Sequence, residues 1–539
     1  MAVFLIHFAA ILRSSVNIPS DDEWEVYRDP ATMSLRWLFH QHNEHRIVTS
    51  KVLILLQHHL NGWNHPINQI LNFVVYGVIL VSLSGIAKKL APQMPIWTIL
   101  SFNIFLLSPI AWMNHLIGFQ MCFHFWLLCF LLSSYLLFSV PQTWQRLILG
   151  CLAFVLCLYS LATGLASGLI VLLLFVIFKI TRAYSAKSSQ GRIREIVQVT
   201  FVVIVLVGAI TLWFVDYVTP SGSRGLSLPS EVGFWRMFLN LVSFGFGIDA
   251  ISITLGAICL LIVIAPVVWQ VWRQKAKLAA EQWAAYSMVL AILGTLAFIA
   301  MGRSALGIEW SKTSRYSEIG MPLIILSLIT WSWVVPLGRR FGLFVPVGLW
   351  IFCLVSFSDN WSFVNYAQIT AGRNVGRLCV QDYYQHGGPA VCPQLFHSPL
   401  AEALERARYL NASFYRDISA RIVLEKQQTT SAPSPSPHYS VILDVADCRQ
   451  LAGWASSDTR ESRSLSVEIH DGEKMTATVA SDLSRPDVHE AGVGSLLSGF
   501  VFPTPTSMKD GQPQTIRVRV AGASRDLISA SKSLTCAPP

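Results

Sequence analysis

The sequence predicts a mainly α-helical membrane bundle followed by a small all-β domain. Only 13% of the 539 residues are charged, 53% are hydrophobic, and the mean hydropathy is +0.49. Soluble globular chains carry about 25% charged residues, so the composition favours a polytopic membrane protein over a soluble enzyme. The long apolar runs stop after residue 358. Beyond residue 438, segments alternate apolar and polar residues, as half-buried strands do.

The membrane part consists of stretches close to the roughly 20 apolar residues that cross a hydrocarbon core about 30 Å thick. The stretch from Ala2 to Leu12 is too short, and no small-residue cleavage site of a signal peptide follows it. We interpret it either as a shortened first span or as the remainder of a longer one whose start codon has been placed too late. With it, the prediction is about eleven spans, the others being 67–85, 95–113, 121–140, 147–163, 164–180, 197–214, 249–270, 284–301, 319–336 and 341–358.

The net charge of +9 indicates orientation rather than nucleic-acid binding, because Lys and Arg lie in short loops between spans, where positive charge marks the cytoplasmic side. With the loop at Asp21 outside, alternation leaves a basic cluster in every inside loop. These clusters are Lys88-Lys89, Arg146, Arg182 with Lys187, Arg192 and Arg194, Arg273 with Lys275 and Lys277, and Arg339-Arg340. The same alternation places the region after residue 358 outside.

Four parts are expected along the chain: a membrane bundle over 1–358, a mixed segment over 359–426, a Pro/Ser-rich linker over 427–438 and a β-sandwich over 439–539. Ser398-Pro399 predicts the start of a helix in the mixed segment, with Leu400, Leu404 and Ala407 on its buried face. Asp471-Gly472 predicts a hairpin turn. The expected strands are Ser440–Val445, Ser464–His470, Lys474–Ala480 and Thr515–Ala521.

Cysteine positions agree with this division. Six of the ten cysteines fall within predicted spans, where a free thiol acts as a small hydrophobe. The other four predict two disulfides in an oxidising compartment, Cys379–Cys392 and Cys448–Cys536. The alternative is four free thiols.

The outer loops hold the candidate site. The first contains Asp21-Asp22-Glu23-Trp24, then Gln41-His42-Asn43-Glu44-His45-Arg46 and an amphipathic stretch from Ile47 to Leu60. Later outer loops carry His115 and Gln120, a charged stretch over 215–248, and a last group at 302–316. That group contains Arg303, Glu309, Trp310, Arg315 and Tyr316.

These residue types suit transfer of a sugar from a lipid phosphate. A carboxylate takes a proton from an attacking hydroxyl, arginines bind phosphate bidentately, and aromatic rings stack on sugars. We assign catalysis to Asp21, Asp22 and Glu23, and donor-phosphate binding to Arg46, Arg303 and Arg315. Acceptor or sugar binding falls on Trp24, His42, Glu44, His45, His115, Gln120, Glu309 and Tyr316.

Each assignment has a simpler alternative. The acidic run also fits a solvated turn before a helix, the arginines fit membrane-edge anchors, and the aromatics fit an interfacial belt. His42 and His45 have the chemistry of metal ligands, but Glu44 and Arg46 beside them favour a hydrogen-bonded cluster. No metal and no other cofactor is expected.

The short first span, the acidic first outer loop, the amphipathic stretch and the external C-terminal domain together resemble the GT-C superfamily of membrane glycosyltransferases. The resemblance covers roughly residues 1–425 and includes Gln41 to Arg46 and the later Gly-Arg and Ser-Arg-Tyr segments. It implies a polyprenyl-phosphate or polyprenyl-diphosphate sugar donor, a cell-envelope glycan or lipid acceptor, and Asp21 or Asp22 as base. It also implies a bacterial inner membrane, with the C-terminal region in the periplasm.

The last domain resembles a small β module found at the ends of bacterial glycosyltransferases and surface proteins. The similar segments are Gly453-Trp454-Ala455, Arg485-Pro486-Asp487-Val488 and Gly499-Phe500. Glycan binding is one role for such a module, and simple packing of Trp454 is the alternative.

Three other functions remain open. A glycan or lipid transporter or flippase usually places ionisable groups near the bilayer midplane, and the predicted spans from 147 to 358 carry essentially none in their centres. An O-antigen ligase or polymerase shares the substrate class. A structural envelope protein would use the β module alone.

Overall fold

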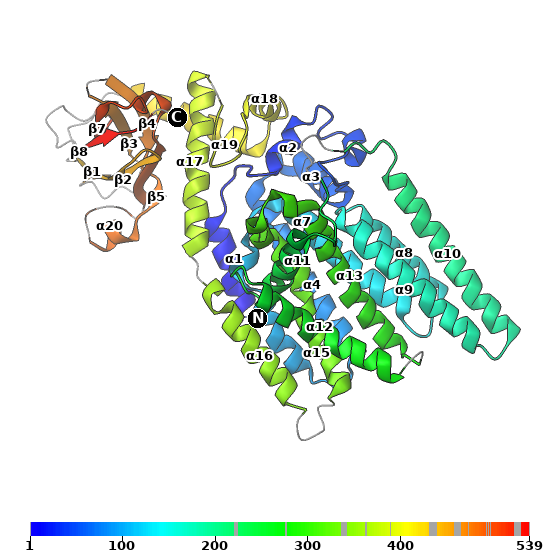
Figure 1. Cartoon of the computed structure of the whole chain (residues 1–539). Helices are drawn as coiled ribbons and strands as arrows, with labels where there is room; N and C mark the ends of the chain where they lie inside the picture. Colours follow the sequence, from blue (N-terminus) through cyan, green and yellow to red (C-terminus); the bar gives the residue numbers. More distant parts are fainter. Residues whose placement is uncertain are drawn as a thin grey trace. The chain divides into compact units, whose positions relative to one another are not determined.

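The computed structural model describes residues 2–219, 225–274, 277–335, 342–361, 364–388, 390–430, 439–457, 465–472, 474–491, 493, 495, 497–521 and 530–537. They form two compact units, each described by itself below (Figure 1). The helical unit comprises Met1–Ser15 and Asp29–Tyr366, and the mixed unit comprises Val16–Arg28 and Ala367–Pro539. The first outer loop is therefore divided, because Val16–Arg28 belongs to the mixed unit.

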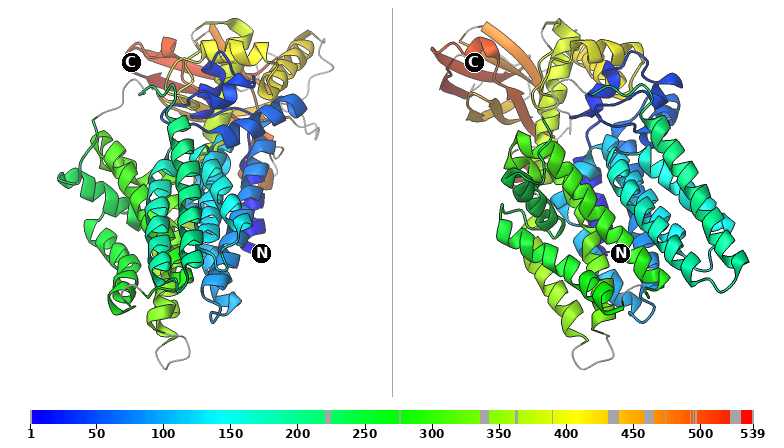
Figure 2. Two further views of the ribbon diagram at one scale, coloured as in Figure 1. Left: turned by 90° about the vertical axis from the view of Figure 1, so that its right-hand side faces the viewer. Right: turned by 45° about the vertical axis from the view of Figure 1, so that its right-hand side comes forward.

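The helical unit is built from α-helices joined by short 3-10 turns (Figure 2). Its longer helices are α1 (Ala2–Ser14), α3 (Val48–Asn61), α4 (His65–Leu90), α5 (Ile96–Leu106), α7 (Met121–Phe138), α8 (Trp144–Leu158), α9 (Thr163–Ser185), α10 (Ser189–Trp213), α11 (Val232–Gly245), α12 (Ile253–Gln274), α13 (Ala280–Arg303), α15 (Pro322–Val334) and α16 (Phe344–Phe357). The short elements are η1 (Arg36–Phe39), η2 (Pro109–Ala111), α6 (Trp112–Leu116), η3 (Gly118–Gln120), η4 (Ser304–Leu306), η5 (Ile308–Lys312), η6 (Ser314–Tyr316), α14 (Ser317–Gly320) and η7 (Ser358–Trp361).

Among the described residues, eight helices are long and apolar enough to cross a membrane, or up to nine if the bent pair Ile96–Leu106 and Pro109–Leu116 is one span. The predicted multi-span membrane protein is confirmed, and each predicted span overlaps a described helix. The count is lower than about eleven because α1 and α8 have only 13 and 15 residues against the roughly 20 that a bilayer needs.

Two segments of the outer loops are also helical. The stretch predicted to be amphipathic forms α3 and exposes Val52, Leu56 and Leu60 at four-residue spacing. Residues 232–245, expected to be part of a loop, form α11, which packs on α12 and α13. The reason lies in its apolar positions, which recur at helical spacing and are buried although the segment is too short to span.

Hydrogen bonds in the helical unit join chain segments that the sequence assigns to the same side of the membrane. The backbone N–H of Thr49 donates to Tyr159 O at 3.4 Å, and Arg46 donates to Trp213 O at 2.7 Å, so the ends of two predicted spans that were assigned to the outside contact the first loop. At loops assigned to the inside, Arg194 donates to Gln142 O at 2.7 Å. Helix ends that share a predicted side therefore lie together.

The mixed unit begins with α2 (Glu23–Arg28) and continues with α17 (Val364–His386, of which the unit takes Ala367 onward), α18 (Ala401–Tyr409) and α19 (Ser413–Thr430). The predicted face of α18 is confirmed: Leu400, Leu404 and Ala407 are all buried, although the helix begins two residues after Pro399. The predicted disulfide Cys379–Cys392 is present. Of the predicted linker, residues 431–438 lie outside the described residues.

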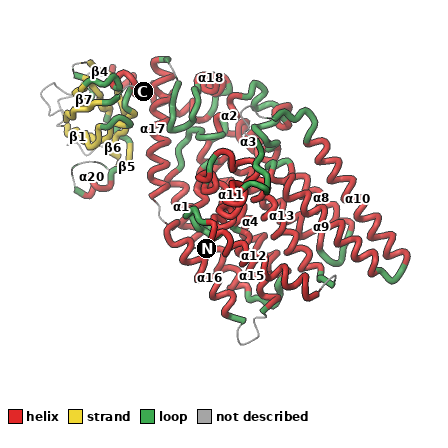
Figure 3. The backbone as a smooth tube through the Cα atoms, viewed as in Figure 1, coloured by secondary structure: helices red, strands yellow, loops and turns green. Residues whose placement is uncertain are grey.

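The predicted antiparallel β domain is confirmed. It consists of two four-stranded sheets, with more strands than the four expected, and Figure 3 shows strands only in this part of the chain. The strand orders are β1-β2-β6-β5 and β4-β3-β7-β8. The strands are β1 (Tyr439–Ala446), β2 (Gln450–Ser457), β3 (Ser466–Asp471), β4 (Lys474–Ala480), β5 (Leu483–Ser484), β6 (Leu497–Pro503), β7 (Pro513–Val520) and β8 (Ala530–Thr535), with short α20 (Pro486–Glu490) and η8 (Thr506–Met508) between them.

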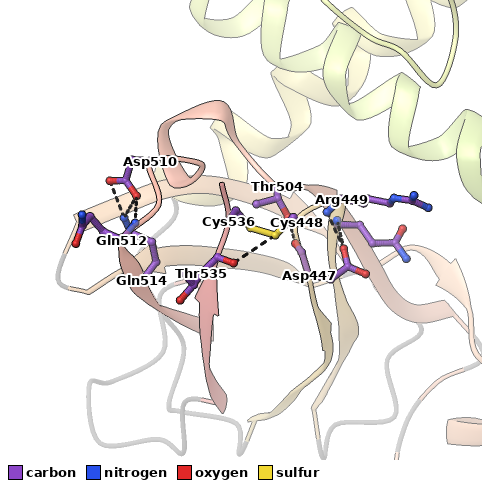
Figure 4. The surroundings of a disulfide bond; sticks show 10 residues. Asp447, Cys448, Arg449, Thr504, Asp510, Gln512, Gln514, Thr535 and Cys536 are labelled. Atoms are coloured by element: carbon purple, nitrogen blue, oxygen red, sulfur yellow. Dashed lines mark hydrogen bonds between the residues drawn. A yellow bond between two sulfur atoms is a disulfide. The ribbon is translucent and has the colours of Figure 1, made fainter. Parts of the chain in front are cut away.

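Local contacts explain why two of the sequence segments singled out in this domain contain glycine. Gly472 has φ +58° at the predicted hairpin turn. A Cβ on Gly453 would lie 1.9 Å from Ile442 O, so the neighbouring strand requires glycine there. The second predicted disulfide, Cys448–Cys536, joins the end of β1 to the end of β8 (Figure 4).

Candidate functional site

A charged cluster forms where the loop predicted to be the first outer one meets the end of α13. Arg303 Nη2 donates to Glu44 Oε1, and His45 Nε2 lies 3.8 Å from the same oxygen. Arg315 from η6 acts electrostatically on the same carboxylate. We call Glu44, His45, Arg303 and Arg315 the surface cluster, because the Arg303 and Glu44 side chains remain 31% and 36% exposed.

The surface cluster stabilises the ionised form of its carboxylate. Burial alone would raise the pKa of Glu44, but the neighbouring positive charges outweigh it and hold that pKa below its ordinary value of 4.5. A carboxylate with a lowered pKa is a weak proton acceptor. Glu44 therefore suits the positioning of Arg303 better than general-base chemistry.

A tight turn and an adjacent arginine hold this loop in place. The backbones of His42 and His45 exchange two hydrogen bonds of 2.8 Å, with Asn43 at φ +47° between them. Arg46 donates to Trp213 O, Phe39 O and Val215 O. It thereby supplies hydrogen-bond donors to backbone carbonyls at the end of α10, where a helix has none of its own. The structure thus gives Arg46 a scaffolding role, and its phosphate-binding role stays a prediction.

A second cluster of ionisable groups is buried inside the helical unit. His115 Nε2 lies 2.9 Å from Glu318 Oε1, and His124 Nε2 lies 3.0 Å from Glu318 Oε2. The side chains of these two histidines are 0% exposed and that of Glu318 is 3% exposed. His7 adds a third imidazole, 3.3 Å from His115 Nδ1. We call these four residues the buried cluster.

Asn114 connects the two clusters. Its Nδ2 donates to the carbonyl oxygen of Arg315 at 3.0 Å and to Glu318 Oε2 at 2.8 Å. Because η6 and α14 are consecutive, a shift of this segment would move the Arg315 backbone and the Glu318 carboxylate together.

The predicted catalytic residues lie in the mixed unit, at the start of α2. Glu23 is buried and accepts a hydrogen bond of 3.0 Å from the backbone N–H of Ser20, as the glutamate of a capping box does. Asp21 is exposed at φ +51°, and Asp22 is half-buried. The charges of Glu23 and Asp21 act on the buried Arg373, which also donates to Ser20 Oγ at 3.0 Å.

The remaining predicted residues differ in exposure. Trp24 is fully buried and packs edge-on against Phe414. Tyr316 is buried too, and the Arg315 guanidinium lies over its ring, 5.7 Å from the ring centre. Gln120 is buried, whereas Glu309 is exposed. His42 is buried against the Phe119 ring. Their sugar-binding roles stay predictions.

No family model matches this chain, and searches of curated proteins and of solved structures found no match. We therefore infer the function from the residues themselves and from the geometry described above.

Sequence reasoning missed His7, His124, Glu318 and Arg373. His7 and His124 are polar residues inside apolar stretches, and Glu318 directly precedes a predicted span. Ionisable residues in such places are rare and often functional, so this signal could have found three of the four. Arg373 lies in a polar segment where an arginine carries no such signal.

Proposed function

We propose that the chain is a membrane glycosyltransferase of the GT-C type, which moves a sugar from a polyprenyl-phosphate-type lipid donor to a cell-envelope glycan or lipid. The observation that carries the proposal is the surface cluster. Two arginines, from α13 and η6, flank one partly exposed carboxylate at helix ends that the sequence assigns to one side of the membrane.

Arginines at the edge of a bilayer suit a phosphate headgroup, because a guanidinium donates two parallel hydrogen bonds to phosphate oxygens. Glu44 holds Arg303 by its Nη2. A donor phosphate would take over this guanidinium, and the carboxylate would then be available to the sugar or acceptor. Arg303 and Arg315 are therefore the proposed phosphate ligands.

The base is assigned to Asp21 or Asp22 from the sequence resemblance alone. Glu23 is excluded from this role in the proposal, because its buried carboxylate holds the Ser20 backbone. The site would face the periplasm of a bacterial inner membrane, following the distribution of positive charge.

A transfer assay tests the proposal. The purified full chain is incubated with a panel of radiolabelled polyprenyl-phosphate and polyprenyl-diphosphate sugars and with envelope acceptors. We expect product with wild type, a loss of about 10²–10⁴ in rate for Asp21→Asn or Asp22→Asn, and wild-type rates for the control Glu281→Gln, an exposed residue without an assigned role. Full rates in both aspartate variants and in the double variant would remove the base, and no product with any donor would reject the activity.

One observation favours transport as a second candidate. His124 and Glu318 of the buried cluster and the pair Lys179–Glu195, 2.7 Å apart, place ionisable groups within helical segments long enough to span, as transporters do. In sealed proteoliposomes, movement of a polyprenyl-linked sugar between leaflets without transfer would favour this candidate.

A further inference from the structure

Three side chains with metal-ligand chemistry converge in the buried cluster from three separate elements. His115 comes from α6, His124 from α7 and Glu318 from α14. One ligand atom of each can be chosen so that all three atoms lie within 4.8 Å of one another. The surface cluster and the proposed sugar transfer do not use this group of three, apart from the earlier assignment of His115 to acceptor binding.

The hydrogen bonds of His124 fix the state of its ring. Nδ1 lies 3.2 Å from the carbonyl oxygen of Asn72. A carbonyl only accepts, so Nδ1 carries the hydrogen. In the neutral ring, Nε2 is then a bare electron pair, and this atom faces the carboxylate of Glu318.

His115 contacts His7 through its other ring nitrogen. Nδ1 of His7 lies 2.9 Å from Leu107 O and so carries a hydrogen, which leaves Nε2 of a neutral His7 as an acceptor. This Nε2 contacts the Tyr366 hydroxyl and lies 3.3 Å from Nδ1 of His115. When Nδ1 of His115 is the donor to His7, Nε2 of a neutral His115 is bare. This Nε2 lies 2.9 Å from Glu318 Oε1, but the angles of the contact are not those of a hydrogen bond.

Two imidazole nitrogens and one carboxylate thus face one another in a buried space, where either a proton on a ring nitrogen or a bound metal ion balances the negative charge. We propose that His115, His124 and Glu318 bind one divalent transition-metal ion, with Zn²⁺ as the best fit. Two imidazole nitrogens and a carboxylate oxygen form a set of donors that zinc prefers. The orientation of His124 by a backbone carbonyl is the support that metal-binding histidines usually have.

Further coordination has candidates at the same place. Within the described chain, Oδ1 of Asn72 and Oδ1 of Asn114 are buried and have no hydrogen-bond partner. Both residues already touch the group, Asn114 through Glu318 and Asn72 through His124.

The three ligand side chains are buried, which indicates a structural role for the ion rather than access to substrate. The ion ties α6, α7 and α14 together. Since Asn114 joins α14 to Arg315, the ion also fixes the segment that carries one arginine of the surface cluster.

The test uses the full chain in detergent or nanodiscs and does not depend on the transferase activity. The protein is stripped with a chelator and titrated with Zn²⁺, and then with Co²⁺ for its absorption spectrum. We expect about one ion per chain, a Tm that rises by ~5 °C at zinc concentrations far above Kd, and a low-coordinate Co²⁺ spectrum. Zinc X-ray absorption should show nitrogen or oxygen ligands at about 2.0–2.1 Å.

The variants His124→Asn and Glu318→Gln should lose the ion and the Tm rise, whereas the exposed control His59→Asn should keep both. Equal binding in all variants would mean an adventitious ion only and would overturn the proposal. A wild-type protein that binds no ion and shows no Tm rise would overturn it as well. If a variant fails to fold, the wild-type titration and spectra alone still decide.

Discussion

The surface cluster and the buried cluster each contain one glutamate surrounded by positive or protonatable groups, but they are built for different tasks. Glu44 pairs with an arginine, and both side chains are about one-third exposed. Glu318 contacts two histidines and an asparagine and is almost fully covered. An exposed ion pair can exchange a partner for a ligand at little cost, whereas a buried one cannot lose a partner without a large penalty. The first therefore suits substrate binding and the second suits the support of the fold.

The largest expected effect comes from breaking the buried cluster. Glu318→Ala leaves two buried imidazoles without their carboxylate and should destabilise the protein by about 3–5 kcal/mol. Glu44→Ala should cost no more than about 1 kcal/mol, because its partner is solvent-exposed. Thermal unfolding of both variants in the same detergent measures the difference, and equal shifts would contradict the contrast between the clusters.

Glycines near the two clusters give a second comparison. A Cβ on Gly320 in α14 would lie 2.7 Å from the Cα of Gly245 in α11. Gly320→Ala should therefore cost about 1–3 kcal/mol and disturb Glu318. Gly302, next to Arg303 in α13, has open space, so Gly302→Ala should be neutral or stabilise by up to about 1 kcal/mol. A lower Tm for Gly302→Ala than for Gly320→Ala would contradict the close approach of α11 and α14.

Much of the fold could be predicted from the sequence because its signals are local. Apolar runs of span length fixed the helices, and the period-two strands and Asp471-Gly472 fixed the β domain. Positions of four cysteines fixed both disulfides. The span count was too high because apolar composition alone does not measure the length of a helix, as α8 shows.

The sites were harder to predict because side chains far apart in sequence form them. Glu44 and Arg303 are 259 residues apart in the sequence, and their contact depends on how the helices beside them pack. The contact of Glu318 with His115 and His124 depends on how α6, α7 and α14 pack, which no local pattern encodes. For Glu23 a local signal was available but missed, because Ser20-Asp21-Asp22-Glu23 matches the Ser-x-x-Glu pattern of a capping box.

A double-mutant cycle measures how strongly Glu44 and Arg303 of the surface cluster stabilise each other. Glu44→Gln, Arg303→Ala and the double variant should give a coupling energy of about 0.2–1 kcal/mol in stability, as exposed ion pairs do. Unfolding curves of the four proteins provide it. A coupling of several kcal/mol would mean that the pair is structural, and its release to bind a phosphate would then be ruled out.

The smallest effect is a dependence on pH. The pKa of Glu44 in the folded protein is below its ordinary value of 4.5, so the unfolded chain binds more protons between the two values. The stabilisation by Glu44 is therefore present above pH 4.5 and is lost as the pH falls through the folded pKa. Compared with Glu44→Gln, the wild type should lose slightly more stability in acid. A parallel acid dependence of the two proteins would contradict the charge interactions assigned to Glu44.

Equilibrium binding of polyprenyl phosphate to the full chain in nanodiscs tests the role of the surface cluster most directly. The double variant Arg303→Ala/Arg315→Ala is compared with wild type and with Arg236→Ala, an exposed arginine on α11. The account predicts at least about tenfold weaker binding in the double variant, since each lost charge-assisted contact is worth about 1.5–3 kcal/mol, and unchanged binding in Arg236→Ala. Equal affinity in all three proteins would contradict it.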